Sequence, residues 1–247
     1  MVIAVSGKGG TGKTTLSALV VRHWIGRRLK PVLAVDADPN NNLGSKLGLE
    51  AQRTIGDLRE DALKHKHDAA GTPKQRTIEY EVQQAISEGS GFDLLVMGRG
   101  EGPGCYCSVN NMLRTFLHEL ASGYQYIVID NEAGMEHLSR RTDDKADVML
   151  VVCDQTPTGM QSARRIAELA AELEVVKGRT GLVVNRVNDS KNVEQQASAL
   201  TGLDVLGCVP DDPLVRNFEQ RSEPLINLPD DSTAVAAIGG ILESIKS

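Results

Sequence analysis

A glycine-rich segment directly behind a short apolar run constrains this chain more than any other feature. Residues 2–5 are Val-Ile-Ala-Val, and residues 7–15 are Gly-Lys-Gly-Gly-Thr-Gly-Lys-Thr-Thr. The order of strand, loop and helix is that of a P-loop, in which glycines let successive backbone N–H groups point at phosphate oxygens. A simple strand-to-helix turn is the alternative. The complete pattern behind a strand favours a nucleotide site.

Each position of this loop has an expected task. The helix begins at about Lys13, so its positive end faces the phosphates. Lys13 is expected to reach the β- and γ-phosphates, and the Thr14 hydroxyl is expected to bind Mg²⁺. The residues expected to contact the nucleotide here are Gly9, Gly10, Thr11, Gly12, Lys13, Thr14 and Thr15.

Composition narrows the class of protein. With 247 residues the chain is long enough for one α/β core, and its net charge of −6 argues against a general nucleic-acid-binding surface. No apolar run approaches about 20 residues, so we expect no membrane partner. The first strand leaves no room for a signal peptide, and the four cysteines are expected to be reduced. These features predict a cytoplasmic protein.

Strand and helix patterns alternate along the chain, which is typical of a mostly parallel central sheet with helices on both faces. Further strands are expected at 32–36, 92–97, 126–130, 148–152, 181–185 and 205–209. Helices are expected at 16–28, 110–121, 162–173, 193–200 and 233–245. The polar stretch at about 54–90 is predicted to be an insertion, part loop and part helix. We expect one domain over residues 1–247.

A second lysine, Lys8, makes the P-loop more specific. Gly-Lys-Gly-Gly-X-Gly-Lys-Thr-Thr resembles the deviant Walker A motif of the MinD/ParA/ArsA/nitrogenase-iron-protein class of P-loop ATPases. The resemblance implies a homodimer in which Lys8 reaches the partner's nucleotide and acts in catalysis with Lys13. A solvated surface lysine is the alternative.

Several expected strands end in polar residues, at the sheet edge where ligands of open α/β folds bind. The segment from Asp36 to Leu43 resembles the switch I of this class, which implies that Asp36 lies near Mg²⁺ and that Asp38 positions the attacking water. An Asx-type turn is the alternative for this segment. Asp130 is expected to hold Mg²⁺ through water and Gly134 to offer its N–H to the γ-phosphate, unless Asp130 merely caps the next helix.

The adenine contacts rest on resemblance alone. Asn185 closes the strand expected at 181–185 and resembles the asparagine that reads adenine in this class. Pro210 and Asp211 resemble the segment that borders the base.

Two cysteines set this chain apart from a plain P-loop ATPase. Cys105 and Cys107 follow a glycine-rich stretch, within a loop expected at about 98–110. Soft thiolates favour zinc, copper(I), nickel or iron–sulfur chemistry over magnesium. Two sulfurs are half of a four-thiolate site, and a twofold dimer would supply the other half. Two unrelated reduced cysteines are the alternative.

Three segments together resemble the nickel-inserting accessory ATPases of carbon monoxide dehydrogenase and acetyl-CoA synthase, the CooC/AcsF group. They are the two-lysine P-loop, residues 102–111 and residues 130–138. The resemblance implies a homodimer that uses ATP, ADP and Mg²⁺ and carries Ni²⁺ or Zn²⁺ on Cys105 and Cys107 to one of those two client enzymes.

Two other functions stay open. An iron–sulfur ATPase of the nitrogenase-iron-protein type is the stronger, although no cysteine lies in residues 130–138. A MinD- or ParA-like positioning ATPase is the weaker, because the C-terminal helix lacks a basic face for membrane binding. His65, His67 and His137 receive no assigned role.

Overall fold

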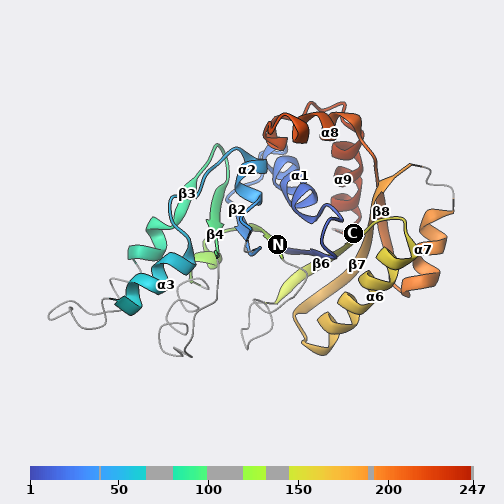
Figure 1. The fold of residues 1–247 in the computed structure, drawn as a ribbon, viewed down its shortest axis with the longest axis horizontal. Helices are drawn as coiled ribbons and strands as arrows, with labels where there is room; N and C mark the ends of the chain where they lie inside the picture. Colours follow the sequence, from blue (N-terminus) through green and yellow to red (C-terminus); the bar gives the residue numbers. More distant parts are fainter. Residues whose placement is uncertain (39, 65–79, 99–118, 132–144, 189–191, 246–247) are drawn as a thin grey trace.

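The structure is a computed structural model that describes residues 1–38, 40–64, 80–98, 119–131, 145–188 and 192–245. The described strands form an eight-stranded sheet in the order β3-β4-β2-β5-β1-β6-β7-β8 (Figure 1). The strands are β1 (Val2–Gly7), β2 (Val32–Asp36), β3 (Ile86–Glu88), β4 (Asp93–Val96), β5 (Tyr126–Asp130), β6 (Ala146–Cys153), β7 (Val176–Val187) and β8 (Val205–Pro210). Only the edge strand β3 pairs in antiparallel fashion among these strands. The predicted mostly parallel sheet is confirmed.

Helices cover both faces of the sheet because the buried strands alternate their side chains between two apolar clusters. Ile3 and Val5 of β1 pack with α1 and α9, whereas Ala4 between them packs with α6 and α7. The helical elements are α1 (Lys13–Gly26), α2 (Leu43–Leu47), α3 (Ile55–Lys64), α6 (Pro157–Glu172), α7 (Val193–Thr201), α8 (Pro213–Gln220), the 3-10 turn η2 (Leu225–Asn227) and α9 (Thr233–Ser244). None of the described helices is long and apolar enough to cross a membrane.

The structure adds short elements that the sequence analysis does not predict. The stretch predicted as an insertion supplies α3 and the edge strand β3, a strand that was not predicted because it is three residues long and only partly buried. Helices α2 and α8 were not predicted either, since each is eight residues or fewer. The helix predicted at 110–121 lies mostly outside the described residues.

Strand register brings the P-loop and two aspartates to one edge of the sheet. Val5 in β1 is the register partner of Asp130 in β5, and Asp36 in β2 is the partner of Asp130 on the other side. Because β1, β2 and β5 are parallel, their carboxyl ends and the loops that follow them meet at the same place.

Candidate nucleotide and magnesium site

The P-loop connects β1 to α1 in the form that the sequence predicts. Gly10 and Gly12 have φ angles of +82° and +91°, a left-handed conformation that favours glycine. Thr11 closes the loop, since its N–H and Oγ1 both donate to the Lys8 carbonyl oxygen, at 3.3 and 2.8 Å. Lys13 is 8% exposed, with Nζ 3.5 Å from the same carbonyl oxygen, while Lys8 is exposed. The lysine expected on the phosphates therefore lies inside the loop.

Gly7 and Gly12 must be glycines because atoms of neighbouring strands lie too close for a side chain. A Cβ on Gly7 would lie 2.3 Å from the carbonyl oxygen of Val152 in β6, and a Cβ on Gly12 would lie 2.3 Å from Asn185 Nδ2. Both glycines allow the loop to pack tightly against the neighbouring strands, which sets its position relative to the sheet.

The end of β7 holds the loop from the side. Asn185 is 5% exposed, and its Nδ2 donates to the Thr11 carbonyl oxygen at 2.8 Å. Arg186 Nη1 donates to the Gly10 carbonyl oxygen at 3.2 Å. The predicted adenine contact of Asn185 stays a prediction; the contact that the structure shows is the one by which its amide fixes the P-loop backbone.

Two buried carboxylates lie side by side next to the loop. Asp36 is 0% exposed and Asp130 is 1% exposed. Burial raises the pKa of Asp36 to about 7 and that of Asp130 to about 6. Asp36 Oδ2 accepts a hydrogen bond from the Leu43 N–H at 2.8 Å, so this carboxylate also fixes the start of α2.

Asp130 carries an oxygen that lacks a partner. Its Oδ1 accepts a hydrogen bond from Ser17 Oγ at 3.1 Å, but the buried Oδ2 has no hydrogen-bond partner in the described part of the chain. The Thr14 side chain lies close enough to this carboxylate to oppose the rise of its pKa. Carboxylate and hydroxyl oxygens are the ligands that Mg²⁺ prefers, and an unpaired buried oxygen is costly without a cation or donor. The residues present therefore fit a magnesium ion.

Asp38 is partly buried and engaged locally. Its Oδ1 accepts hydrogen bonds from the backbone N–H and from Nδ2 of Asn40, at 2.8 and 2.9 Å. This is the Asx-type turn named above as the alternative. The charge of Asp38 also raises the pKa of both Asp36 and Asp130, so it lies within electrostatic range of the proposed cation site. Its water-positioning role stays a prediction.

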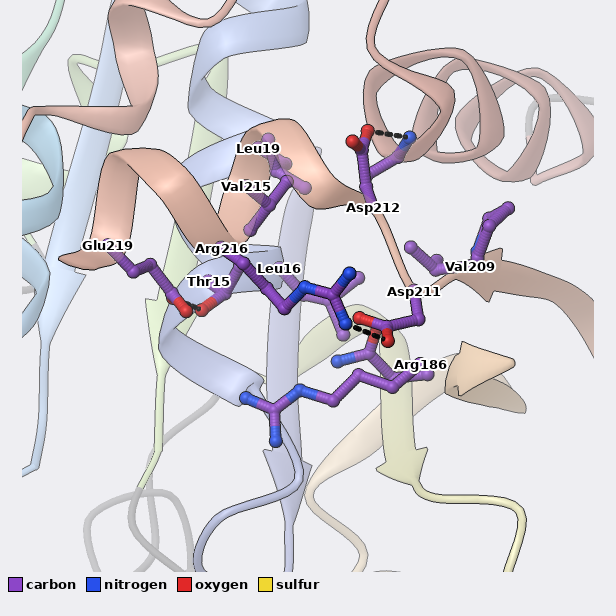
Figure 2. A pocket seen from close by; sticks show the side chains of 13 residues that line it. Thr15, Leu16, Leu19, Arg186, Val209, Asp211, Asp212, Val215, Arg216 and Glu219 are labelled. Carbon is purple, nitrogen blue, oxygen red and sulfur yellow. Dashed lines mark hydrogen bonds and ion pairs between the residues drawn. The ribbon is translucent and has the colours of Figure 1, made fainter. Parts of the chain in front are cut away.

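A pocket of about 280 Å³ opens beside α1, between the end of β8 and α8 (Figure 2). The three residues expected around adenine, Asn185, Pro210 and Asp211, all line it together with Thr15. Arg216 Nη1 pairs with Asp211 Oδ2 at 2.6 Å. The structure thus brings the expected base-binding residues and the P-loop helix around one cavity.

Sequence reasoning missed several residues of this region. Ser17 lies one helical turn after Thr14 and therefore on the same face of α1. Helical periodicity is the signal by which it could have been found. Glu219 accepts a hydrogen bond from Thr15 Oγ1 at 2.6 Å, and nothing in the local sequence around Glu219 indicates that contact.

Other predicted site residues lie outside the described residues. They are Gly134, Cys105 and Cys107; His65, His67 and His137, which have no assigned role, lie outside the described residues too. The two cysteines in the described part of the chain are Cys153 and Cys208. Burial raises the pKa of Cys153 to about 12 and that of Cys208 to about 11. Both therefore stay protonated thiols near neutral pH.

Comparisons with known proteins give the family. Residues 2–225 match the model of the CobQ/CobB/MinD/ParA nucleotide-binding domain. An uncharacterized ATP-binding protein of Methanocaldococcus jannaschii is 40% identical over 99% of this chain and 98% of its own length. The carbon monoxide dehydrogenase accessory protein CooC of Rhodospirillum rubrum is 29% identical over 89% of this chain and 87% of its own length.

Solved structures agree with the fold. The septum site-determining protein MinD of Pyrococcus horikoshii, solved with Mg-ADP, superposes with a TM-score of 0.70 over 100% of this chain and 96% of its own, at 20% identity. Strand order, P-loop geometry and the family model point the same way: this chain is a member of the CobQ/CobB/MinD/ParA family of nucleotide-binding proteins.

Proposed function

We propose that this protein is an ATP-hydrolysing metallochaperone that carries Ni²⁺, or Zn²⁺, to a nickel enzyme. The observation that carries the ATPase half is the buried Oδ2 of Asp130, which lies near Thr14 and the P-loop and has no hydrogen-bond partner within the described ranges of the chain. The metal-carrying half is supported by Cys105 and Cys107 and by the 29% identity to an accessory protein of carbon monoxide dehydrogenase. We take residues 1–247 as one ATPase domain.

In the ATPase half, the P-loop backbone and Lys13 bind the β- and γ-phosphates. Thr14, Asp130 and Asp36 hold Mg²⁺, which when bound neutralises charge on the phosphate oxygens. Asp38 leaves its turn with Asn40 and orients a water in line with the γ-phosphate. Pro210, Asp211 and Asn185 surround the base in the pocket of Figure 2.

In the metal half, the cargo is bound by thiolates from two copies of the chain. Each protomer contributes Cys105 and Cys107, so that four sulfurs surround one ion on the twofold axis. Lys8 of each protomer reaches the nucleotide of the other, which makes the dimer sensitive to the γ-phosphate. Hydrolysis removes contacts to Gly134, loosens the dimer and favours release of the ion to carbon monoxide dehydrogenase or acetyl-CoA synthase.

The test is anaerobic size-exclusion chromatography with light scattering and metal analysis, with and without ATP. Wild type is compared with Cys105→Ser/Cys107→Ser and with the matched control Cys153→Ala/Cys208→Ala, which removes the two cysteines of the sheet. We expect one Ni²⁺ or Zn²⁺ per dimer in wild type and in the control, and none in the Cys105/Cys107 variant.

The other outcomes separate the rival functions. Equal metal in both double variants contradicts the shared thiolate site. A visible absorbance band from bound iron and sulfide indicates an iron–sulfur ATPase instead. ATP-dependent dimers that hold no metal indicate a MinD-like positioning ATPase.

A further inference from the structure

One carboxylate oxygen ties together three helices next to the pocket. Glu219 Oε1 in α8 accepts a hydrogen bond from Thr15 Oγ1 in α1 and an ion-paired hydrogen bond from Lys46 Nζ in α2, both at 2.6 Å. The Glu219 and Lys46 side chains are 27% and 24% exposed, so the pair is mostly shielded from water. Figure 2 shows Glu219 and Thr15 meeting at the wall of the pocket.

The neighbours of Glu219 keep its carboxyl group ionised. Burial alone would raise its pKa, but the hydrogen bonds from Lys46 and Thr15, the charge of Lys46 and that of Arg186 outweigh burial and lower the pKa. Glu219 is therefore ionised near neutral pH and needs a compensating cation.

Only one member of this ion pair is part of the pocket wall. Glu219 lines the pocket, whereas Lys46 is not among its lining residues in the described part of the chain. The other two acidic residues of the wall are already engaged, Asp211 by Arg216 and Asp212 by the starts of α8 and α9. A carboxylate at this wall without a nearby positive charge would repel an anionic ligand. Lys46 supplies that positive charge to Glu219 without lining the pocket.

The position of Lys46 is fixed from the other end of its helix. The N–H of Leu43, the first residue of α2, donates to Asp36 Oδ2. The five-residue helix α2 thus spans from the buried Asp36 to Glu219. The backbone of Lys46 is therefore held within reach of Glu219, and its Nζ lies 2.6 Å from Glu219 Oε1.

We infer that Lys46 is a positioning residue for the nucleotide: it neutralises and holds Glu219 at the pocket wall and so permits a polyphosphate to bind beside Thr15, without touching the nucleotide itself. This inference rests on the proposed nucleotide site. It predicts that the contribution of Lys46 disappears once the charge of Glu219 is removed.

The experiment is a double-mutant cycle read by calorimetric titration with Mg-ADP and with a slowly hydrolysed ATP analogue. We expect Lys46→Met to weaken nucleotide binding about tenfold, because a charge at short range in a partly buried site is left unpaired. We expect Lys46→Met/Glu219→Gln to bind within about twofold of Glu219→Gln alone. Lys177→Met is the matched control, because Lys177 pairs with Asp147 at 2.9 Å at the opposite edge of the sheet, and it should leave affinity unchanged.

Three results overturn the inference. One is wild-type affinity in a folded Lys46→Met protein. Another is a loss of nucleotide affinity on Lys46→Met that is as large in the Glu219→Gln protein as in wild type, which means that Lys46 binds the nucleotide directly. The third comes from Lys46→Arg, which keeps the charge and should bind within about threefold of wild type; a loss as large as that of Lys46→Met shows that charge is not the cause. Failure of wild type itself to bind nucleotide refutes the proposed function instead.

Discussion

The buried carboxylate of Asp130 destabilises the protein without a ligand and favours the state in which a cation is bound. Asp130 is 1% exposed and has a carboxylate oxygen without a hydrogen-bond partner among the described residues. Burying a charged group without full compensation destabilises the fold. Such a residue is best explained by a ligand that supplies the missing positive charge.

This reasoning predicts opposite effects of Asp130→Asn on stability and on binding. Without nucleotide, the melting temperature should stay equal or rise, because the neutral amide costs less to bury. Affinity for Mg-ADP should fall at least about tenfold, and the difference from wild type should shrink in EDTA. Thermal denaturation and calorimetric titration measure both effects.

Asp147→Asn is the contrasting control. This carboxylate accepts a hydrogen bond from the Val2 N–H at 2.6 Å and pairs with Lys177, far from the loop. Its loss should lower the melting temperature and leave Mg-ADP affinity unchanged. A clear drop in melting temperature for Asp130→Asn would contradict the assigned role of Asp130.

The sequence indicates motif residues more readily than the residues that contact them. Asp36 and Asp130 were identified from motifs that follow apolar strands, and Asn185 was identified by resemblance alone; the structure places all three around the P-loop. Ser17 and Glu219 were not identified, because their partners are set by the packing of α1 against β5 and α8, a tertiary fact that local patterns do not contain.

At the scale of elements, the P-loop depends on β7 for its shape. Gly12 is the cap residue of α1, with a φ of +91°, and it faces Asn185 Nδ2. Strain from a positive φ and the close contact act together, so the loop tolerates no side chain here.

We therefore expect Gly12→Ala to lower the free energy of unfolding by about 2 kcal/mol or more and to abolish the stabilisation by Mg-ADP. The matched control is Gly26→Ala at the other end of α1, where a Cβ meets nothing within 4 Å. That variant should be neutral or stabilised by up to about 1 kcal/mol. Urea denaturation with and without Mg-ADP tests both, and equal behaviour of the two variants would refute the steric account.

Asp212 caps α8 and also hydrogen-bonds the start of α9, whose own cap is Ser232. Asp212 Oδ1 accepts from the Leu214 N–H at 2.8 Å at the start of α8, and its Oδ2 accepts from Ser232 Oγ at 2.6 Å and from the Ala234 N–H at 3.0 Å at the start of α9. The main observed contacts of Asp212 are structural, and they position one wall of the pocket.

Asp212→Asn should lower the free energy of unfolding by about 1 to 3 kcal/mol at pH 7. The hydrogen bonds hold the folded pKa of Asp212 below its ordinary value, against the opposing effect of burial. Its stabilisation is therefore present above the unfolded pKa of about 3.9 and is lost as the pH falls through the folded pKa.

Urea denaturation at pH 7 and at about pH 3 should show the Asp212→Asn deficit shrinking at the lower pH. Asp211→Asn is the neighbouring control; it breaks only the ion pair with Arg216 and should cost less than about 1 kcal/mol. A deficit that grows as the pH falls would contradict the capping role.

Among the elements, the long buried strands were predicted and the short peripheral pieces were not. The strands β1, β2, β5 and β6 are continuous apolar runs, so their pattern is strong. The edge strand β3 and the helix α2 are too short to show a period. They form because the sheet edge and Asp36 give them partners, which is information that the local sequence lacks.

In the whole molecule, the proposed function requires that the nucleotide site and the thiolate site depend on one another. The nucleotide site is built from described residues around the P-loop, while the thiolate site of Cys105 and Cys107 is assigned from sequence and resemblance. Coupling between them requires that the metal ion bind more tightly in one nucleotide state than in another. Without that difference, hydrolysis cannot drive release.

The most direct measurement is therefore the affinity of the protein for Ni²⁺ in the two nucleotide states. An anaerobic competition with a chromophoric chelator would be run in saturating Mg-ADP and in a saturating, slowly hydrolysed ATP analogue. The account predicts tighter Ni²⁺ binding with the ATP analogue by at least about fivefold, and loss of this difference in Cys105→Ser/Cys107→Ser. Equal Ni²⁺ affinity in both nucleotide states would contradict it.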